Sequence, residues 1–384
     1  MDSDNNKMVY HIFPADVPFH VVGMLRTFIT YFGDLSFFII AGATEETRPL
    51  YEDVFKHFQF DRFQIIMMND KDREYPTLKK FLIKKKFVNQ YDKELVSYMA
   101  ELPKSTTFLL HALSSRWFNI LLNIHGFKNV NWVCWGCWYY NKSKTLQAFL
   151  FNNIDRLNYS IYKNVICLMP QDIEDIKVQL KSKAEFFYIP YPGNNKYLVE
   201  YALSNPGDRQ AGISVLLGNN GYSIERYDQF IRSLGDIGAD YKITCMVSYG
   251  AEESQIESFR SAYSEFIERG DLALLTKMLS KEEYVVMLNS FDIYLCPYDT
   301  QTGLAAIYLS LALGKKIYLQ GSNYEYIKQL GAVISHTDEF KTDMNKKEFF
   351  LSEKEKEINK IIITNLLDKD SVISKWNSFF NHIL

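Results

Sequence analysis

The sequence predicts an α/β protein made of two halves, each built around a parallel β-sheet. Short apolar runs that end at glycine, proline or asparagine alternate with longer amphipathic stretches, and this alternation is typical of βαβ units. The pattern is interrupted by two turn-rich segments, Pro190–Asn195 and Ser204–Asp208, and it resumes after them. With 384 residues, the chain is long enough for two domains that each bury a core.

In the first half we expect seven strands, a helix at Val21–Phe32 and another that runs through Trp117 to Ile124. The strands are Met8–Phe13, Phe37–Ala41, Phe63–Met68, Thr107–His111, Asn131–Gly136, Asn164–Met169 and Glu185–Ile189. In the second half we expect six strands: Ile213–Leu217, Tyr241–Val247, Leu272–Leu275, Ile293–Cys296, Lys316–Leu319 and Ala332–Ile334. Helices such as Glu252–Arg269 and Lys281–Asn289 lie between them, and the tail is helical. The expected domains are 1–190 and 212–352, with a linker at 191–211 and a C-terminal helical segment at 353–384.

Composition excludes several classes of protein. The formal net charge of −3 argues against a nucleic-acid-binding protein, which would normally be basic. The five cysteines are scattered, which fits buried thiols in a reducing compartment, and the pair Cys134 and Cys137 lacks the second pair that a zinc site needs. The start of the chain does not read as a signal peptide, and no apolar run approaches the ~20 residues of a membrane span. We therefore expect a cytoplasmic protein without a cofactor, either soluble or peripheral to a membrane.

Two strand–turn–helix corners in the second half predict a diphosphate site. The strand Ile213–Leu217 leads through Gly218-Asn219-Asn220-Gly221 into a helix at Ile224–Leu234, and the strand ending at Cys296 leads through Gln301-Thr302-Gly303 into a helix at Leu304–Leu313. Parallel strands end at the same edge of a sheet, where open α/β folds bind ligands. Glycine turns let a phosphate approach closely, and helix starts offer free N–H groups. For either corner alone, an ordinary turn without a ligand is the alternative.

These corners define a set of eight expected donor-binding residues. The set is Gly218, Asn219, Asn220, Gly221, Tyr249, Gln301, Thr302 and Gly303. Backbone N–H groups at 220–223 and 302–304 are expected to bind the diphosphate oxygens, and the ring of Tyr249 is placed to stack on the base or the ribose. The helix ends would then neutralise the charge of the diphosphate in place of a metal ion, so no metal is expected here.

The first half offers candidates for the chemistry of the acceptor. Asp16 and His20 follow the first strand and could take a proton from an acceptor hydroxyl; a helix cap and a surface histidine are the alternatives. His111 ends another strand, where a catalytic role stands beside that of a core histidine. Trp135, Gly136 and Trp138 belong to an aromatic cluster that suits a sugar or a lipid-linked acceptor, with core packing as the alternative.

Two further patterns follow the third strand. Asp70 and Asp72 spell D-x-D, which could hold a divalent cation on a nucleotide diphosphate, although a solvated charged loop is the favoured interpretation. The stretch Leu78–Val88 mixes lysines with large apolar residues and could lie on an anionic membrane surface, with a plain surface helix as the default.

As an ordered set, these pieces resemble the N-acetylfucosaminyltransferases of glycosyltransferase family 56. The matching pieces are His11 with Ala15-Asp16-Val17-Pro18 and His20, Phe108–His111, Trp132–Gly136, Tyr188–Pro190, Leu216–Gly221, Val247–Gly250 and Gln301–Gly303. The family moves a 4-acetamido-4,6-dideoxygalactose unit from a dTDP-sugar to a polyprenyl-diphosphate-linked disaccharide in bacterial glycan assembly. The resemblance implies the GT-B fold, in which two Rossmann-like domains face each other across a cleft and a C-terminal helix closes the structure.

The expected function is thus sugar transfer from a dTDP- or UDP-sugar donor to a glycan acceptor that is lipid-linked. The first domain would bind the acceptor and the second the donor, without a metal, at the inner face of the cytoplasmic membrane. Cys137 and Trp138 stand where the family usually carries a small residue and an acid, so the acceptor or the donor sugar could differ. The alternatives are a metal-dependent GT-A-like transferase that uses Asp70 and Asp72, and a non-catalytic binder of nucleotide sugars or glycans.

Overall fold

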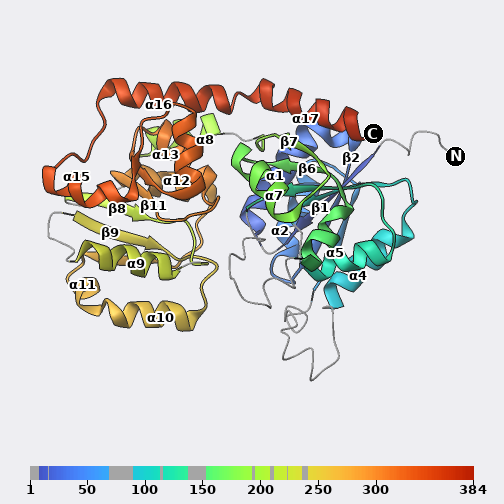
Figure 1. The fold of residues 1–384 in the computed structure, drawn as a ribbon, viewed down its shortest axis with the longest axis horizontal. Coiled ribbons are helices and arrows are strands. Elements are labelled where there is room, and N and C mark those ends of the chain that lie inside the picture. Colours follow the sequence, from blue (N-terminus) through green and yellow to red (C-terminus); the bar gives the residue numbers. More distant parts are fainter. Residues whose placement is uncertain are drawn as a thin grey trace. The chain divides into compact units, whose positions relative to one another are not determined.

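The computed structural model describes residues 8–15, 17–68, 90–112, 116–136, 153–192, 195–207, 212–222, 224–235 and 241–384. The chain forms two compact units, shown in Figure 1. Unit 1 consists of Met1–Gly193 together with Lys369–Leu384, and unit 2 consists of Asn194–Asp368.

Unit 1 is built on a parallel sheet. In its described residues the seven strands are β1 (Val9–Pro14), β2 (Ser36–Ala43), β3 (Phe63–Met67), β4 (Thr107–His111), β5 (Val130–Cys134), β6 (Tyr162–Cys167) and β7 (Glu185–Tyr188). Their order is β3-β2-β1-β4-β5-β6-β7, and every neighbouring pair is parallel. The helices are α1 (Pro18–Phe32), α2 (Arg48–His57), α4 (Gln90–Glu101), α5 (Arg116–Ile124), α7 (Pro170–Leu180) and α17 (Lys369–Ile383), with short 3-10 turns η2 (Gly33–Leu35) and η4 (Tyr159–Ile161).

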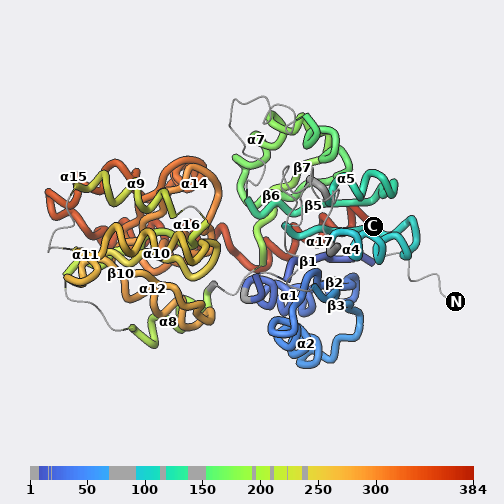
Figure 2. The backbone as a smooth tube through the Cα atoms, turned by 90° about the horizontal axis from the view of Figure 1, so that it is seen from below, coloured from blue at the N-terminus to red at the C-terminus, as the bar shows by residue number. Residues whose placement is uncertain are grey.

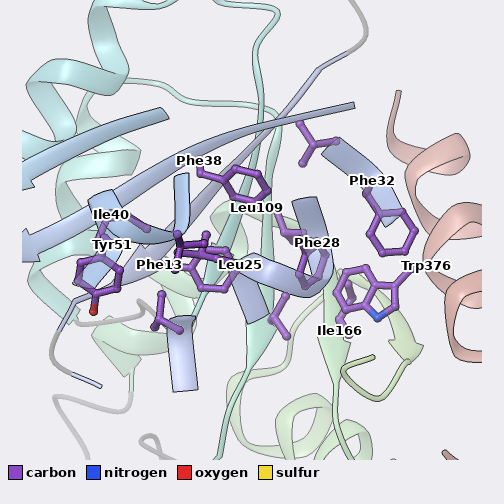
Figure 3. Close-up of a cluster of buried hydrophobic side chains, with 14 of the residues drawn as sticks. Phe13, Leu25, Phe28, Phe32, Phe38, Ile40, Tyr51, Leu109, Ile166 and Trp376 are labelled. Carbon is purple, nitrogen blue, oxygen red and sulfur yellow. The ribbon is translucent and has the colours of Figure 1, made fainter. Parts of the chain in front are cut away.

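The sheet of unit 1 carries an apolar cluster on each face. Along β1, Phe13 belongs to one cluster and its neighbour Ile12 to the other, because successive strand side chains point to opposite faces. Burial on both faces explains why the strands read as continuous apolar runs. The cluster in Figure 3 includes Trp376, which α17 inserts beside Phe28 with the two rings 5.0 Å apart. The C-terminal helix is therefore part of this core.

Unit 2 repeats the architecture with six strands among its described residues. They are β8 (Ile213–Leu217), β9 (Tyr241–Met246), β10 (Leu272–Leu275), β11 (Ile293–Cys296), β12 (Lys316–Leu319) and β13 (Ser335–His336), in the parallel order β10-β9-β8-β11-β12-β13. The helices are α8 (Asn195–Ser204), α9 (Ile224–Leu234), α10 (Glu253–Ala262), α11 (Ser264–Glu268), α12 (Lys281–Ser290), α13 (Leu304–Ala312), α14 (Gly321–Gln329), α15 (Phe340–Lys346) and α16 (Glu353–Leu366), with the 3-10 turn η5 (Thr337–Glu339). Figure 2 shows the same elements from a second direction.

Most expected strands are present, and two expectations need correction. The strand expected at Ala332–Ile334 lies at Ser335–His336 instead, because both backbone polar groups of Val333 bond the side-chain amide of Asn359, at 2.7 and 3.0 Å. The single helix expected at Glu252–Arg269 is two helices that break at Tyr263, whose hydroxyl donates to Asp228 at 2.7 Å.

The boundary between the units falls between Gly193 and Asn194, near the start of the linker expected over 191–211. Ten residues of that linker form α8, which packs against α12 and belongs to unit 2. The C-terminal segment expected at 353–384 is helical, but it divides between the units: α16 belongs to unit 2 and α17 returns to unit 1. An amphipathic pattern shows that a helix has an apolar face but does not identify the core that this face meets.

Candidate active site

Three loops of unit 2 meet at the carboxyl edge of its sheet. They follow the neighbouring strands β9, β8 and β11, and hydrogen bonds connect them. The N–H of Gly218 donates to the carbonyl of Leu295 at 2.7 Å, and the N–H of Gly221 donates to the carbonyl of Tyr249 at 2.7 Å. All eight residues of the predicted donor set lie on these loops.

Gly218 is a glycine because another side chain occupies the place of its Cβ. Its φ is +75°, and a Cβ atom there would lie 1.8 Å from Oη of Tyr227. Tyr227 comes from α9 and reaches under the turn, where its hydroxyl donates to the carbonyl of Asn220. Tyr298, from the β11–α13 loop, donates to the same carbonyl at 3.0 Å. Two buried phenols thus support the turn from below.

The side chains of Asn219 and Asn220 bond the second corner. Their Nδ2 atoms lie 3.3 and 3.2 Å from the hydroxyl oxygen of Thr302. Both asparagines are buried, and Gly303 passes so close that a Cβ atom there would lie 2.9 Å from Cγ of Asn219. The two corners are therefore joined through their side chains.

Two of the backbone N–H groups that we expected to bind a diphosphate at the first corner have partners within the protein. The N–H of Gly221 already bonds Tyr249, and the N–H of Tyr222 donates to Oδ1 of Asn220 at 3.1 Å. A Cβ atom at Gly221 would lie 2.6 Å from Cβ of Ala251, so this glycine allows two loops to pack rather than a phosphate to approach. Sequence spacing predicts the turn, but it does not show where the turn directs its amides.

The second corner keeps the features of an anion site. Gly303, with φ +65°, precedes α13, and no side chain caps this helix. The first N–H groups of a helix have no partner within the helix and carry partial positive charge. Beside them, Gln301 is buried and its Oε1 has no hydrogen-bond partner among the described residues; the same holds for Oδ1 of Asn323. Both oxygens are acceptors and suit a hydroxyl or N–H group of a ligand rather than an anion. The amide nitrogen of Asn323 donates to the carbonyl of Thr302 at 2.9 Å and fixes the corner from α14.

Tyr249 is a hydrogen-bonding phenol rather than a base. Burial raises its pKa to about 12, and hydrogen bonds from Asn220 and Asn219 oppose this shift. Its ring meets the ring of Tyr222 edge to face at 5.9 Å. At neutral pH the hydroxyl is protonated, so Tyr249 is able to position a ligand but not to remove a proton from one.

In unit 1, the candidates follow the neighbouring strands β1, β4 and β5, but the structure places them in different surroundings. His111 is fully buried, and its two ring nitrogens lie 3.0 Å from His11 and 2.6 Å from the hydroxyl of Tyr191. Both nitrogens therefore have partners inside the core. This is the environment of a core histidine, so the assignment of His111 as a catalytic residue is corrected.

The other first-half candidates lie nearer the surface or outside the described residues. His20 is exposed on the first turn of α1. Trp135 is half-buried, and its indole N–H donates to the hydroxyl of Tyr191 at 2.6 Å, while Gly136 after it is buried. Asp16 and Trp138 lie outside the described residues.

Asp70 and Asp72, like the stretch Leu78–Val88, lie outside the described residues. Within the described part of the chain, no group of three or more His, Cys, Asp or Glu side chains lies in a position to hold a metal ion. The two separate parallel sheets of the structure contradict the GT-A-like alternative.

Sequence reasoning missed the residues that support the corners from other elements. Tyr227, Tyr298 and Asn323 each reach the two loops from outside the glycine motifs. A usable signal existed for Asn323, because Gln320-Gly321 after the apolar strand β12 forms a third glycine corner. No signal in the sequence pointed to the two tyrosines, since they resemble other buried aromatics.

Comparison with solved structures identifies the fold. The chain is similar to a glycosyltransferase from Rickettsia africae (TM-score 0.61, 10% identity, 99% of each chain covered), to a sucrose-phosphate synthase from Thermosynechococcus elongatus (0.64, 11%, 98% of this chain and 99% of the other) and to a UDP-forming α,α-trehalose-phosphate synthase from Burkholderia vietnamiensis (0.65, 10%, 98% and 99%). At these identities the likeness concerns the fold, which is that of GT-B glycosyltransferases.

The sequence itself shows the family. Residues 6–381 match the model described as "4-alpha-L-fucosyltransferase glycosyl transferase group 56", which confirms the resemblance found in the motifs. Because the match spans nearly the whole chain, the protein belongs to glycosyltransferase family 56 and is a glycosyltransferase with a GT-B fold.

Proposed function

We propose that this enzyme transfers a deoxy- or amino-sugar from a dTDP- or UDP-sugar to a lipid-linked glycan acceptor in the assembly of bacterial surface polysaccharide. Family membership supports the transfer of a sugar. A similar fold in a synthase whose description reads "UDP-forming" supports a nucleotide-diphosphate donor. The lipid-linked acceptor rests on the motif resemblance to family 56.

The observation that carries the donor half of the proposal is the gathering of eight predicted residues at one sheet edge. Asn219 and Asn220 each bond Thr302 there, and the uncapped start of α13 follows directly. In the proposed complex the diphosphate lies against this helix start, where N–H groups and the helix dipole stabilise negative charge. Tyr249 is the donor-facing aromatic ring, and Gln301 supplies an oxygen without a protein partner.

The chemistry requires a base for the acceptor and stabilisation of the leaving group. The acceptor oxygen attacks the anomeric carbon, the bond from that carbon to the diphosphate oxygen breaks, and the nucleoside diphosphate leaves with the electron pair. The proton of the acceptor hydroxyl passes to a base, for which we propose the carboxylate of Asp16, with His20 as the alternative. Both residues follow β1, and the exposed position of His20 on α1 supports access by an acceptor.

We assign the acceptor to unit 1, at Trp135, Gly136 and Trp138. Aromatic faces with a polar edge suit sugar rings, and Trp135 is half-buried at the end of β5. No helix among the described residues has the length and apolar character needed to cross a membrane. For a lipid-linked acceptor we propose peripheral contact with the inner face of the cytoplasmic membrane, carried by the lysine-rich stretch Leu78–Val88 with its positive charges. Cosedimentation with anionic and neutral vesicles tests this contact.

Titration calorimetry with dTDP and UDP tests the donor site. The wild-type protein is expected to bind at least one of them, and Thr302→Val is expected to weaken binding about 5- to 20-fold, because it removes the hydroxyl that both asparagines contact. Thr244→Val is the matched control, since Thr244 lies inside β9, before the carboxyl edge. Absence of binding to both nucleotides, or equal affinities in the two variants, contradicts the assignment.

A further inference from the structure

Three backbone N–H groups of the β8–α9 corner already have partners within the protein. The N–H groups of Gly221 and Tyr222 bond Tyr249 and Asn220, and the N–H of Asn220 faces the hydroxyl of Tyr227 at 3.4 Å. A departing diphosphate carries several negative charges, and one helix start offers about half a unit of positive charge. A positively charged side chain from the β8–α9 segment would add to this charge balance.

Arg226 is the cation that this segment places beside the second corner. It is the third residue of α9, and its guanidinium forms an ion pair with Asp299 of the β11–α13 loop. Asp299 lies two residues before Gln301 and four before Gly303, so the pair adjoins the proposed diphosphate position. The ion pair thus adds to the contacts that Thr302 and Tyr298 make with the asparagines.

The two partners of this ion pair are held differently. Asp299 is fixed by the β12–α14 loop: its Oδ1 accepts from Gln320 at 2.8 Å, and its carbonyl accepts from the N–H of Ser322 at 3.0 Å. Beyond Asp299, Arg226 has a weak contact of 3.4 Å with Gln229 on its own helix. The side chains of the pair are 39% and 47% exposed, and ion pairs at such exposure contribute about 0–1 kcal/mol, so a more highly charged anion would displace the carboxylate readily.

We propose that Arg226 binds the donor diphosphate, and that Asp299 holds the guanidinium next to the site until the donor replaces the carboxylate. The proposal rests on the proposed function. An arginine suits this position because its charge is permanent at any physiological pH and its planar group bonds two phosphate oxygens at once. Asp299 then acts as a competitor of the donor: it preorganises Arg226 and is displaced when the diphosphate binds.

Calorimetric titration of the full chain with UDP, dTDP, uridine and inorganic pyrophosphate tests the proposal. Arg226→Ala is expected to weaken binding of the diphosphates about tenfold or more and to leave uridine binding unchanged, because the lost contact is to phosphate. Arg226→Lys is expected to recover part of the affinity. Asp299→Asn keeps the hydrogen bond to Gln320 and removes the competing charge, so it is expected to tighten diphosphate binding a few-fold.

Arg232→Ala is the matched control, because Arg232 lies on the same helix and pairs with Asp228 away from the corner. A merely structural ion pair would weaken binding in both the Arg226→Ala and the Asp299→Asn variants, whereas the proposal requires opposite effects. Equal affinities in Arg226→Ala and Arg232→Ala, with a wild-type protein that binds UDP or dTDP, overturn the role of Arg226 alone. A wild-type protein that binds neither nucleotide overturns the proposed donor site, and the role of Arg226 with it.

Discussion

Nε2 of His111 lies 3.0 Å from Nδ1 of His11, and both rings are fully buried in unit 1. The remaining nitrogens also have partners: Nδ1 of His111 lies 2.6 Å from the hydroxyl of Tyr191, and Nε2 of His11 lies 3.2 Å from that of Ser36. Phe13 stacks on His111 with the ring centroids 3.8 Å apart. The pair therefore sits in an apolar cluster with every ring nitrogen satisfied.

The two ends of this hydrogen-bond chain set its direction. The indole N–H of Trp135 can only donate, and it does so to the hydroxyl of Tyr191 at 2.6 Å. The carbonyl of Phe32 can only accept, and it does so from Ser36 at 2.7 Å. Each group between the ends has one proton to donate, so both histidines are neutral and protonated at Nε2. Neither end exchanges a proton at neutral pH, so the chain organises the core and does not relay protons.

Acid is therefore expected to destabilise unit 1 through these histidines. Burial lowers the pKa of His11 to about 3, and burial together with the repulsion that a protonated His11 would exert lowers the pKa of His111 well below its ordinary value. The unfolded chain takes up protons below its ordinary pKa of about 6.5, while the folded core does not. The free energy of unfolding is thus expected to fall as the pH drops from 6.5 toward 3, by about 1.4 kcal/mol per pH unit for each histidine.

Denaturant unfolding of the wild-type protein and of His11→Gln, between pH 7.5 and 5, measures this slope. The variant lacks one of the two buried histidines, so the slope of its unfolding free energy against pH is expected to be smaller by the contribution of one proton. His57→Asn is the control, because His57 is exposed on α2 and its removal leaves the buried pair intact. Identical slopes in all three proteins would show that the histidines do not couple to stability.

The sequence predicted the fold well where a local pattern determines the structure. The strands Thr107–His111, Ile213–Leu217 and Lys316–Leu319 begin and end at the expected residues, because short apolar runs bounded by turns are a strong signal for buried parallel strands. Parallel topology then brought the predicted loops to one sheet edge. The sequence did not show which distant residues contact one another. His11 bonds His111, which lies 100 residues away, and Trp376 near the end of the chain packs in the core of the first unit.

The same limit applies to the first glycine corner, where two of the N–H groups expected to bind a ligand bond the protein itself. The pattern Gly218–Gly221 indicates a turn with positive φ or a close approach. In the structure Gly218 has a positive φ, and another group of the protein lies close to each of the two glycines. The approaching groups are Tyr227 and Ala251 of the protein itself, which sequence spacing does not distinguish from a phosphate. A glycine in a turn thus shows that some group lies close to the backbone. Whether that group is a ligand or another part of the protein depends on the tertiary structure.

Gly218→Ala is expected to destabilise unit 2 far more than Gly270→Ala. Both glycines have nearly the same backbone, with φ +75° and +77°, so both variants have the left-handed strain of about 1–2 kcal/mol. At Gly270 nothing lies within 4 Å of the new Cβ atom, whereas at Gly218 it meets Tyr227 Oη at 1.8 Å. Thermal unfolding of the two variants measures the difference, which is the cost of displacing the tyrosine from under the corner.

A second substitution separates the clash from other effects. Tyr227→Phe removes the hydroxyl that lies nearest to the glycine, so the double variant with Gly218→Ala is expected to be more stable than the sum of the two single effects predicts. Equal stability of Gly218→Ala and Gly270→Ala would mean that Tyr227 moves aside without cost and does not support the turn.

Two substitutions that remove a basic group, Asp16→Asn and His20→Asn, are compared to identify the base. Asp16→Asn is expected to lower turnover by about 10²- to 10⁴-fold while the affinity for dTDP or UDP stays unchanged, because a general base acts on the acceptor and the proposed donor-binding residues belong to unit 2. His20→Asn is expected to have a much smaller effect. Turnover is measured with a dTDP-sugar and a polyprenyl-diphosphate-linked acceptor, and donor affinity by calorimetry on the same samples. The reverse order of effects would assign the base to His20, and full activity in both variants would place it elsewhere in the chain.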